Sequence, residues 1–519
     1  MWLVILGLLN GIAAGLVYAT EELWFGILFC LVPFAGILLT RTRSSGFLIG
    51  YGMGYYMTGI SFLYALADVV PLPVYTSYAL MTLAVLLISA YLTLLLWLAF
   101  YPFRYIRRGS RLAIFWIAGF YVLGEWLQEI SPLASFPWFR LAVAAVPCPL
   151  LIQGASLAGS LLVSFFLVLC NAWLARLIIK RRIDMGMIIA VLLTVLLLLY
   201  GEVRLYERED SGASVLVVQG NHEGSEKWTL ELEDILADYE RLIYEYASAA
   251  ESAGKRAELV VLPETALPYA AAEYSSTRET LISICRELST ELLLGAIEQE
   301  KRDEETVSYN AVYHVTEGGF AEKTYRKRVL VPFGEYLPFA ELMDRFCPWV
   351  EEFMTGNYFE AGSEQNCFET GVGEIGALIC YESIFPAEAQ GAVLSGAELL
   401  TVVSNDSWFQ GLPAMQEHYA HAALRAVETD RYVIRAGNTG ISGIIDNRGR
   451  TAAGMTEHVQ GGFVAEAAAR RTKTLYTRMG NLFGMMWFVL WCFLIGKHIC
   501  VLIFSVFSDI MYRIKSDSM

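Results

Sequence analysis

The sequence predicts a polytopic α-helical membrane domain joined to an α/β domain that lies outside the membrane. Long apolar stretches fill about the first 200 residues and return once near the C-terminus. Residues 202–482 instead alternate short β-rich runs with helical ones, which indicates one α/β domain with helices covering a sheet. Basic residues gather in alternate connections between the apolar stretches, a distribution typical of membrane spans.

The membrane domain is predicted from hydropathy and length. Of the 519 residues 55% are hydrophobic, and the mean hydropathy of +0.46 is high for a soluble protein. Most apolar stretches approach the roughly 20 residues that cross a bilayer. These stretches are Met1–Ala19, Leu23–Leu39, Phe47–Leu66, Tyr75–Tyr101, Leu112–Leu127, Leu151–Ile179, Met185–Tyr200 and Phe483–Phe507. We therefore expect a membrane domain at 1–201 with about seven transmembrane helices, a final transmembrane helix at 483–507 and a cytoplasmic tail at 508–519. A signal peptide at the N-terminus is disfavoured, because no basic segment precedes the first stretch.

The charges between these stretches predict the orientation. Basic residues follow the second, fourth, sixth and eighth stretches: Arg41, Arg43, Arg104, Arg107, Arg108, Arg111, Lys180, Arg181, Arg182, Arg513 and Lys515. The other connections carry Glu21, Glu22, Asp68 and Glu129, with Arg140 as their positive charge. Both termini are therefore predicted to be cytoplasmic and residues 202–482 to be extracytoplasmic.

Within the outside domain the pattern predicts individual elements. Strands are expected at 215–219, 259–262, 291–297, 374–379, 399–403, 432–436 and 441–446, a hairpin at 307–315 and 319–323, and helices at 230–253, 278–288 and 414–429.

Composition excludes some functions. The net charge of −15 and a pI near 5.0 argue against a nucleic-acid partner. The nine Cys include no CxxC or Cys/His spacing typical of zinc, and the six His are scattered, so no metal site is predicted. A disulfide between Cys347 and Cys367 is left open by the sequence.

Three residues at or near predicted strand ends carry candidate chemistry. Cys380 ends the apolar run 374–379, Glu264 follows the run 259–262 and a proline, and Lys327 lies in the basic run 325–328. A thiol, a carboxylate and an ammonium can act as nucleophile, general base and oxyanion partner. The competing interpretations are a buried structural cysteine, a glutamate at a helix N-terminus and a solvated basic run.

These residues and their flanks resemble the nitrilase superfamily, which places a Glu-Lys-Cys triad on an α-β-β-α sandwich. The flanks are closer still to the bacterial apolipoprotein N-acyltransferases, polytopic enzymes with an outside nitrilase-like domain. The matching segments are 218–221 with Lys227 and Trp228, Leu262–Pro268, Lys327–Glu335, Ile379–Glu382, Ser404–Phe409, Arg435 with 438–440, and in the membrane part Phe136–Trp138.

The resemblance implies residue roles. It selects Lys327 within the basic run, because the lysine comes eight residues before the Glu of the segment VPFGE. It also places Glu335 and Glu382 in the site, with Tyr381 between Cys380 and Glu382 as a supporting residue. Trp228, Asn405 and Trp408 would shape the substrate pocket, although core packing competes as an explanation for both tryptophans.

The resemblance also implies the function. A fatty acyl chain would pass from a membrane phospholipid to the N-terminal amine of a diacylglyceryl-cysteine lipoprotein through a Cys380 thioester, in a ping-pong reaction that ends lipoprotein maturation. The enzyme would lie in the bacterial cytoplasmic (inner) membrane with its catalytic domain on the periplasmic side, and no cofactor is implied.

The aromatic-rich segment Phe339–Phe359, with Trp349 and Phe353, leaves two interpretations open. It is either a loop whose aromatic side chains fill the core or a mobile arm that touches the bilayer interface over a substrate pocket.

Two other functions compete. A membrane-tethered amidase of the nitrilase type would need one span, and this chain has about eight. A transporter or receptor with a non-catalytic outside domain is disfavoured by the intact Glu264, Lys327 and Cys380.

Overall fold

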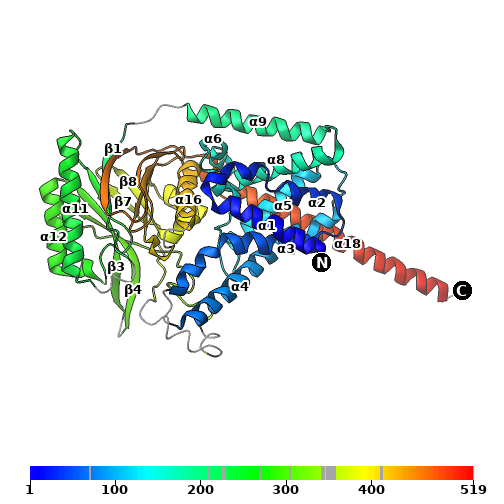
Figure 1. Cartoon of the computed structure of the whole chain (residues 1–519), viewed down its shortest axis with the longest axis horizontal. Coiled ribbons are helices and arrows are strands. Elements are labelled where there is room, and N and C mark those ends of the chain that lie inside the picture. Colours follow the sequence, from blue (N-terminus) through cyan, green and yellow to red (C-terminus); the bar gives the residue numbers. More distant parts are fainter. Residues whose placement is uncertain are drawn as a thin grey trace.

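The computed structural model describes residues 1–68, 72–206, 211–223, 230–268, 270–302, 305–340, 345, 358–409 and 413–517. Figure 1 shows a bundle of helices, built from the start of the chain and its last helix, beside a part that contains two β-sheets. This arrangement confirms the predicted combination of a helical membrane domain and an α/β domain.

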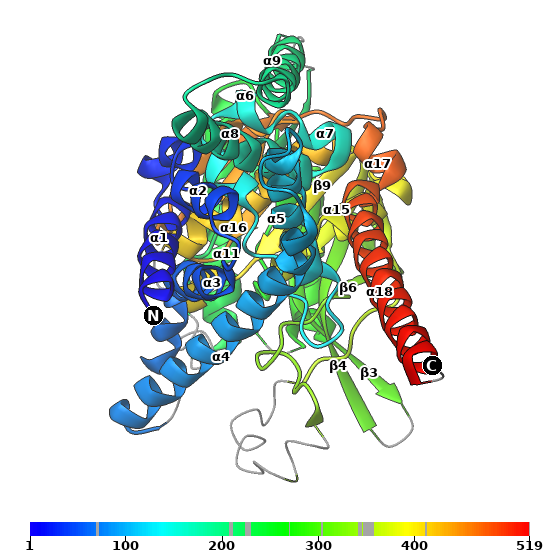
Figure 2. The same cartoon turned by 90° about the vertical axis from the view of Figure 1, so that its right-hand side faces the viewer.

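The helical part contains α1 (Trp2–Ala19), η1 (Glu21–Leu28), α2 (Val32–Thr40), α3 (Ser45–Gly59), η2 (Ser61–Asp68), α4 (Val74–Phe100), η3 (Tyr101–Tyr105), α5 (Ala113–Ile130), η4 (Leu141–Ala145), α6 (Pro149–Ile152), α7 (Ala155–Ala158), α8 (Ser160–Lys180), α9 (Met185–Leu205) and α18 (Leu482–Asp517). Six segments in the described part of the chain are long and apolar enough to cross a membrane: Trp2–Ala19, Glu21–Thr40, Val74–Tyr105, Ser160–Lys180, Met185–Leu205 and Leu482–Cys500. The two other predicted spans correspond to α3, which has 15 residues, and to α5. In Figure 2 the ends of α4 and α18 project from the body of the protein.

Small residues let α1 and α3 pack closely. A Cβ added to Gly7 or Gly11 would lie 2.2 Å from the Phe47 oxygen or 2.1 Å from the Tyr51 oxygen. A Cβ on Gly50 of α3 would lie 2.1 Å from the Val4 oxygen. Backbones in such close contact are typical of helices that associate within a membrane.

The other part has two sheets whose central strands are parallel. The first sheet has the order β13-β1-β2-β3-β4-β5, with β6 also paired to β4, and the second has the order β12-β11-β10-β9-β8-β7. Strands β1, β2 and β3 run parallel, as do β8, β9 and β10. The strands are β1 (Ala213–Gln219), β2 (Leu259–Val261), β3 (Glu291–Arg302), β4 (Glu305–Thr316), β5 (Gly319–Phe320), β6 (Tyr325–Arg326), β7 (Cys367–Thr370), β8 (Gly373–Ile379), β9 (Leu399–Ser404), β10 (Val433–Gly437), β11 (Ser442–Ile445), β12 (Thr451–Met455) and β13 (Gly461–Ala467).

Helices cover the outer face of each sheet and complete four layers. The helices are α11 (Leu232–Ser252), α12 (Ser275–Leu288), α15 (Pro386–Leu394), α16 (Pro413–Thr429) and the short α17 (Leu475–Met479). One apolar cluster joins α11 and α12 to the first sheet, a second lies between the two sheets, and a third joins α15 and α16 to the second sheet. The order helix–sheet–sheet–helix is the predicted α-β-β-α sandwich.

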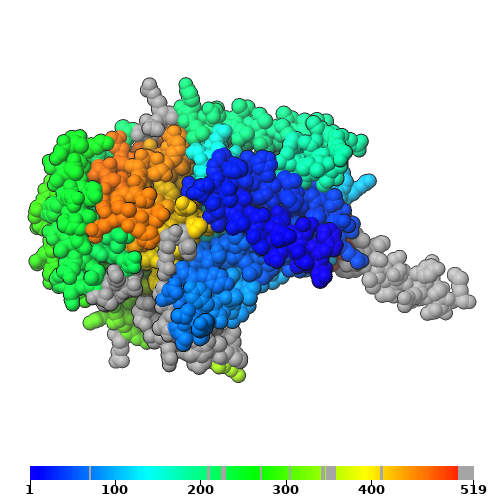
Figure 3. Space-filling view, viewed as in Figure 1, coloured from blue at the N-terminus to red at the C-terminus, as the bar shows by residue number. Residues whose placement is uncertain are grey.

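The two parts share one apolar core. Tyr381, Ile384 and Leu424 of the sheet domain belong to the same buried cluster as the helices of the membrane domain. Polar contacts join the parts as well, because Arg204 of α9 pairs with Asp430 at 3.0 Å and the Ser160 nitrogen donates to Glu428 at 2.7 Å. The two parts lie directly against each other in the space-filling view (Figure 3). Strand ends of the sandwich therefore face the membrane domain across α16.

Candidate active site

Cys380 lies at a strained turn at the carboxyl end of a central strand. It directly follows β8, begins the short helix η6 (Cys380–Ile384), and has a φ of 51°. The left-handed region is unfavourable for a non-glycine residue, and such strain is concentrated at functional sites. Burial raises the pKa of the Cys380 thiol, Glu264 raises it further, and Lys327 opposes both effects. The thiol therefore needs a base if it is to react as a thiolate.

Glu264 is held beside Lys327 by three contacts. Its Oε1 accepts a hydrogen bond from Asn310 Nδ2 at 2.7 Å and lies 3.4 Å from Lys327 Nζ. Its Oε2 accepts from the Asn405 backbone nitrogen at 2.7 Å. Strand β3 passes so close that a Cβ on Gly295 would lie 2.6 Å from the Glu264 Cα, which requires a glycine there. The carboxylate is thus fixed in place at the end of β2.

Lys327 is buried between two carboxylates. Its Nζ donates to Glu335 Oε1 at 2.8 Å, and Asn310 Nδ2 donates to the same oxygen at 3.0 Å. Burial by itself lowers the pKa of Lys327, but Glu335 and Glu264 outweigh burial and hold that pKa above its usual range. The lysine therefore stays protonated, which suits a group that faces a developing oxyanion.

Glu382 acts on the backbone around the site. Its Oε2 accepts from the Ile379 nitrogen at 2.7 Å and from the Tyr325 hydroxyl at 2.9 Å, and its Oε1 accepts from the Arg328 nitrogen at 2.6 Å. Burial raises the pKa of Glu382 to about 7, although the Ile379 and Arg328 N–H groups oppose that rise. This side chain ties the turn that bears Cys380 to the segment that bears Lys327.

Tyr381 connects the site to the membrane domain. Its hydroxyl donates to the Ser135 carbonyl at 2.8 Å, and its ring stacks with Phe136 at 6.4 Å between centroids. Ser135 and Phe136 lie in the loop that follows α5, so a connection of the membrane domain lies against the residue next to Cys380.

The structure describes some of the other residues that were predicted to line the pocket, and not the rest. Asn405 contacts Glu264 through its backbone, and its side-chain oxygen accepts from Asn438 Nδ2 at 3.1 Å. Trp408 is 50% exposed, which rules out the core-packing interpretation for this residue. Trp228, Trp349 and Phe353 lie outside the described residues, as does Cys347, whereas Cys367 is a free thiol.

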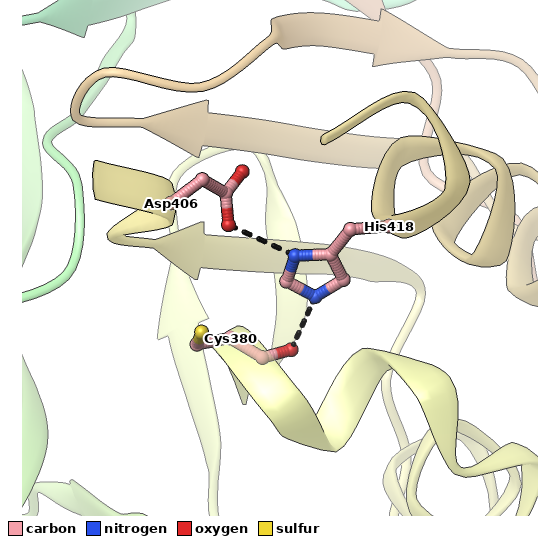
Figure 4. A group of neighbouring side chains, drawn as sticks. All are labelled: Cys380, Asp406 and His418. Carbon is pink, nitrogen blue, oxygen red and sulfur yellow. Dashed lines mark hydrogen bonds and ion pairs between the residues drawn. The ribbon is translucent and has the colours of Figure 1, made fainter. Parts of the chain in front are cut away.

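A buried cluster beneath Cys380 adds residues to which the sequence assigned no role. His418 Nδ1 lies 2.9 Å from Asp406 Oδ1, and His418 Nε2 lies 3.0 Å from the Cys380 carbonyl oxygen (Figure 4). Asp406 Oδ2 also accepts from Arg435 Nη2 at 2.7 Å, and Asp406 Oδ1 accepts from the Ser404 hydroxyl at 2.6 Å. The ring nitrogens and carboxylate oxygens are thus occupied by protein partners, which makes this cluster a hydrogen-bonded clamp rather than a set of open metal ligands.

Comparison with known proteins agrees with this geometry. Residues 215–474 match the carbon-nitrogen hydrolase family, and residues 10–173 match the apolipoprotein N-acyltransferase N-terminal domain. The apolipoprotein N-acyltransferase of Geobacter metallireducens is 32% identical over 404 residues, which are 75% of this chain and 76% of the relative. The chain belongs to the apolipoprotein N-acyltransferase family. It is therefore an enzyme of the carbon-nitrogen hydrolase superfamily and a membrane protein.

Other relatives extend the match. The apolipoprotein N-acyltransferase of Vibrio cholerae is 27% identical over 92% of this chain and 93% of its own length. Among solved structures, an amidase from Nesterenkonia sp. matches 51% of this chain and 94% of its own length, with 16% identity and a TM-score of 0.37.

Sequence reasoning missed Asn310 and left Asp406, His418 and Arg435 without roles. Asn310 gives a weak signal as a polar residue inside the strand β4, where its neighbours Ala311 and Val312 are apolar. The clamp residues come from three separate elements. They meet only because β8, β9 and β10 are neighbouring parallel strands, which no local sequence pattern indicates.

Proposed function

We propose that this enzyme transfers a fatty acyl chain from a membrane phospholipid to the N-terminal amine of a diacylglyceryl-cysteine lipoprotein, through a thioester on Cys380. One observation carries the proposal. The buried Glu264–Lys327–Glu335 group and the strained Cys380 lie at strand ends that abut a loop of the membrane domain. A site built against membrane helices suits an acyl donor that resides in the bilayer.

The first half-reaction forms the thioester. Glu264 takes the Cys380 proton while the sulfur attacks the ester carbonyl of the phospholipid. The negative charge that develops on the carbonyl oxygen faces the Lys327 ammonium, whose pKa is held high by Glu335 and Glu264. As the C–O bond breaks, Glu264 returns the proton to the departing oxygen and a lysophospholipid leaves.

The second half-reaction repeats these roles with an amine. The neutral amine of the lipoprotein attacks the thioester, Glu264 accepts the proton that the nitrogen releases, and Lys327 again faces the oxyanion. The C–S bond breaks, the amide product leaves, and the proton on Glu264 restores the thiol. No redox partner or metal ion takes part in these steps.

Membrane location on the extracytoplasmic side belongs to the same proposal. The basic residues that follow α2, η3 and α8 support a cytoplasmic position for those ends, and with it a periplasmic position for residues 202–482. A lipoprotein acceptor would reach the site from that side.

Intact-mass analysis tests the proposal. Enzyme incubated with phospholipid of one defined acyl chain should gain the mass of that acyl group less one hydrogen, and Cys380→Ala should gain nothing. Addition of a diacylglyceryl lipopeptide with a free N-terminus should discharge the adduct and yield an N-acylated peptide. Release of free fatty acid in place of that product would instead identify a hydrolase.

A further inference from the structure

A cavity of about 310 Å³ lies between the membrane domain and the sheet domain, beside α16. The membrane domain lines it with the connection between α1 and η1 and with the segment 143–149, and the sheet domain lines it with α16 and the start of β12. Figure 1 shows α16 on the side of the sheet domain that faces the helices. Cys380 is not among the described residues that line the cavity, so the cavity is distinct from the candidate active site.

The wall of this cavity is mainly apolar. Its apolar side chains come from both domains and include Val143, Val146, Pro147, Pro413, Ala420 and Ile441. One carboxyl group, that of Glu417 on α16, is buried among them, with 5% of its surface exposed. A buried carboxyl group in an apolar wall is costly unless it has a hydrogen-bond partner, so its partners indicate what the cavity can hold.

Glu417 has one oxygen to offer to an occupant of the cavity. Its Oε2 accepts from the Trp138 indole N–H, whereas its Oε1 has no hydrogen-bond partner among the residues that the structure describes. Burial raises the pKa of Glu417 to about 8, although the bond from Trp138 opposes that rise, so the group is mostly protonated at neutral pH. Because Oε2 accepts from the indole, the proton lies on Oε1. The cavity thus contains an O–H donor between apolar walls, which suits an ester carbonyl next to an acyl chain.

The cavity lies at the level where membrane spans end. Trp2–Ala19 and Glu21–Thr40 are each long and apolar enough to cross a membrane, and the connection between them lines the cavity. Leu16 and Leu23, on either side of this connection, are 50% and 39% exposed, as expected for side chains that face lipid. Because the connection between two spans lies at the membrane surface, the ester groups of the adjoining lipids are at the height of the cavity.

Charged residues of the cavity lining indicate the headgroup. Arg450 keeps a bond from its Nε to Asp446 at 2.7 Å, but its side chain is 36% exposed and has further N–H groups that can contact a phosphate. Glu21 lines the cavity from the membrane domain and is exposed. A cation and an anion together match a headgroup that carries both a phosphate and an ammonium.

We propose that this cavity binds the glycerol-ester part of a zwitterionic phospholipid: Glu417 donates to an ester carbonyl, Arg450 contacts the phosphate and Glu21 faces the ammonium. The volume is at the lower end of the range for small-molecule pockets, so the cavity holds part of the lipid while the rest stays in the bilayer. The lipid contacts both domains and so holds α16 against the membrane domain. The inference is independent of the proposed acyl transfer, because Cys380 does not line the cavity.

Photolabelling in bilayers tests the site. Full-length Cys380→Ala enzyme, which cannot consume lipid through a thioester, is placed in equal parts of phosphatidylethanolamine and phosphatidylglycerol. A trace of one lipid or the other carries a diazirine near the ester end of an acyl chain, and labelled peptides are mapped by mass spectrometry. Segment 143–149 should be labelled about fivefold more by the phosphatidylethanolamine probe, the effect of one ion pair at an exposed site. Leu199, 58% exposed on α9, should be labelled equally by both probes.

Variants of Glu417 test the hydrogen bond. Glu417→Leu removes the donor, whereas Glu417→Gln keeps an N–H group in its place. Labelling of segment 143–149 by the phosphatidylethanolamine probe should fall about fivefold in Glu417→Leu, the effect of one hydrogen bond, and stay within about twofold of the parent in Glu417→Gln. Equal labelling in Glu417→Leu and the parent would overturn the inference.

Two neighbouring acids provide a matched pair that does not depend on a buried substitution. Glu21 and Glu22 are both exposed, but only Glu21 is among the residues that line the cavity. Glu21→Gln should remove the preference for the phosphatidylethanolamine probe, and Glu22→Gln should keep it. Equal labelling of segment 143–149 by the two probes in the parent, or a preference that survives in Glu21→Gln, would overturn the inference. Loss of the label on addition of a diacylglyceryl lipopeptide would also overturn it, because the cavity would then belong to the acceptor.

Discussion

The three adjacent cations at 326–328 pair with different carboxylates. Successive residues of an extended segment point to opposite sides, so neighbours in the sequence reach different partners. Lys327 points inward, where its Nζ contacts Glu335 and Glu264. Arg326 points outward and pairs with Glu298 and Glu300, each at 2.7 Å. Arg328 pairs with Glu388 at 3.0 Å. Position along the segment, rather than charge alone, therefore selects the cation of the site.

Lys327→Ala is expected to slow thioester formation by about 10²–10³-fold, the range for removal of one oxyanion donor. The measurement is the rate of acyl-adduct formation by intact mass with a fixed phospholipid. Arg326→Ala is the matched control and should stay within about threefold of wild type, because its partners lie at the surface. Near-normal turnover in Lys327→Ala would show that an arginine of the run supplies the charge instead.

The side chains of α16 serve two neighbours through helical spacing. Glu417 and His421, four residues apart, form hydrogen bonds with Trp138 of the membrane-domain loop. His418 packs its ring against Trp138 and also contacts the Cys380 carbonyl. Glu417 is buried and accepts a hydrogen bond from the Trp138 indole N–H. Burial raises the pKa of Glu417 to about 8, although the bond from Trp138 opposes that rise. One helix thus links Cys380 to the membrane domain.

Glu417→Gln is expected to stabilise the enzyme at alkaline pH. The pKa of Glu417 is raised in the folded state, so its contribution to stability is fully present below about pH 4.5 and is lost as the pH rises through about 8. Glutamine resembles the neutral acid at every pH. The free energies of unfolding of the two proteins should therefore agree near pH 4.5 and diverge up to pH 8 by about 5 kcal/mol, with the higher thermal midpoint in Glu417→Gln.

The exposed acid Glu251 of α11 provides the control. The stability difference between wild type and Glu251→Gln should not grow as the pH rises. A wild-type protein more stable than Glu417→Gln above pH 8 would mean that the ionised carboxylate has a compensating partner.

Elements with a strong local pattern could be predicted from the sequence, and elements that depend on distant pairing could not. The buried runs of β1, β2, β8 and β9 were predicted because each consists mainly of apolar residues. Strand β13, with the sequence GGFVAEA, was missed because glycine and alanine have low strand propensity. It is a strand because all seven of its residues pair antiparallel with β1.

Some residues of the candidate site could likewise be predicted from the sequence, and others could not. Glu264, Lys327 and Cys380 come at strand ends that the chain itself marks, and the fold places Glu264 and Lys327 in contact. The roles of Asn310 and His418 arise from contacts across 46 and 38 positions of the chain, which no local pattern encodes. Their partners become apparent only when the strands are set side by side.

At the scale of the whole molecule, the residues that follow Cys380 belong to the core that joins the two parts. Tyr381 and Phe385 pack in the same cluster as Phe62 and Trp138 of the membrane domain. The orientation of the helices therefore fixes the side of the membrane on which the chemistry occurs. Helix α9 connects the basic end of α8 to the sheet domain, and its 21 residues are long enough to cross the bilayer once.

Cysteine accessibility in the full-length enzyme tests this orientation. Arg182 and Ser211 are both exposed and lie on either side of α9. Because Lys180, Arg181 and Arg182 form a basic cluster, the positive-inside rule places them in the cytoplasm and Ser211 outside. A membrane-impermeant maleimide should add label to Ser211→Cys in intact cells, relative to the parent enzyme, and to Arg182→Cys only after permeabilisation. The reverse pattern would put Cys380 on the cytoplasmic side, where a lipoprotein acceptor exposed at the outer face of the membrane could not reach it.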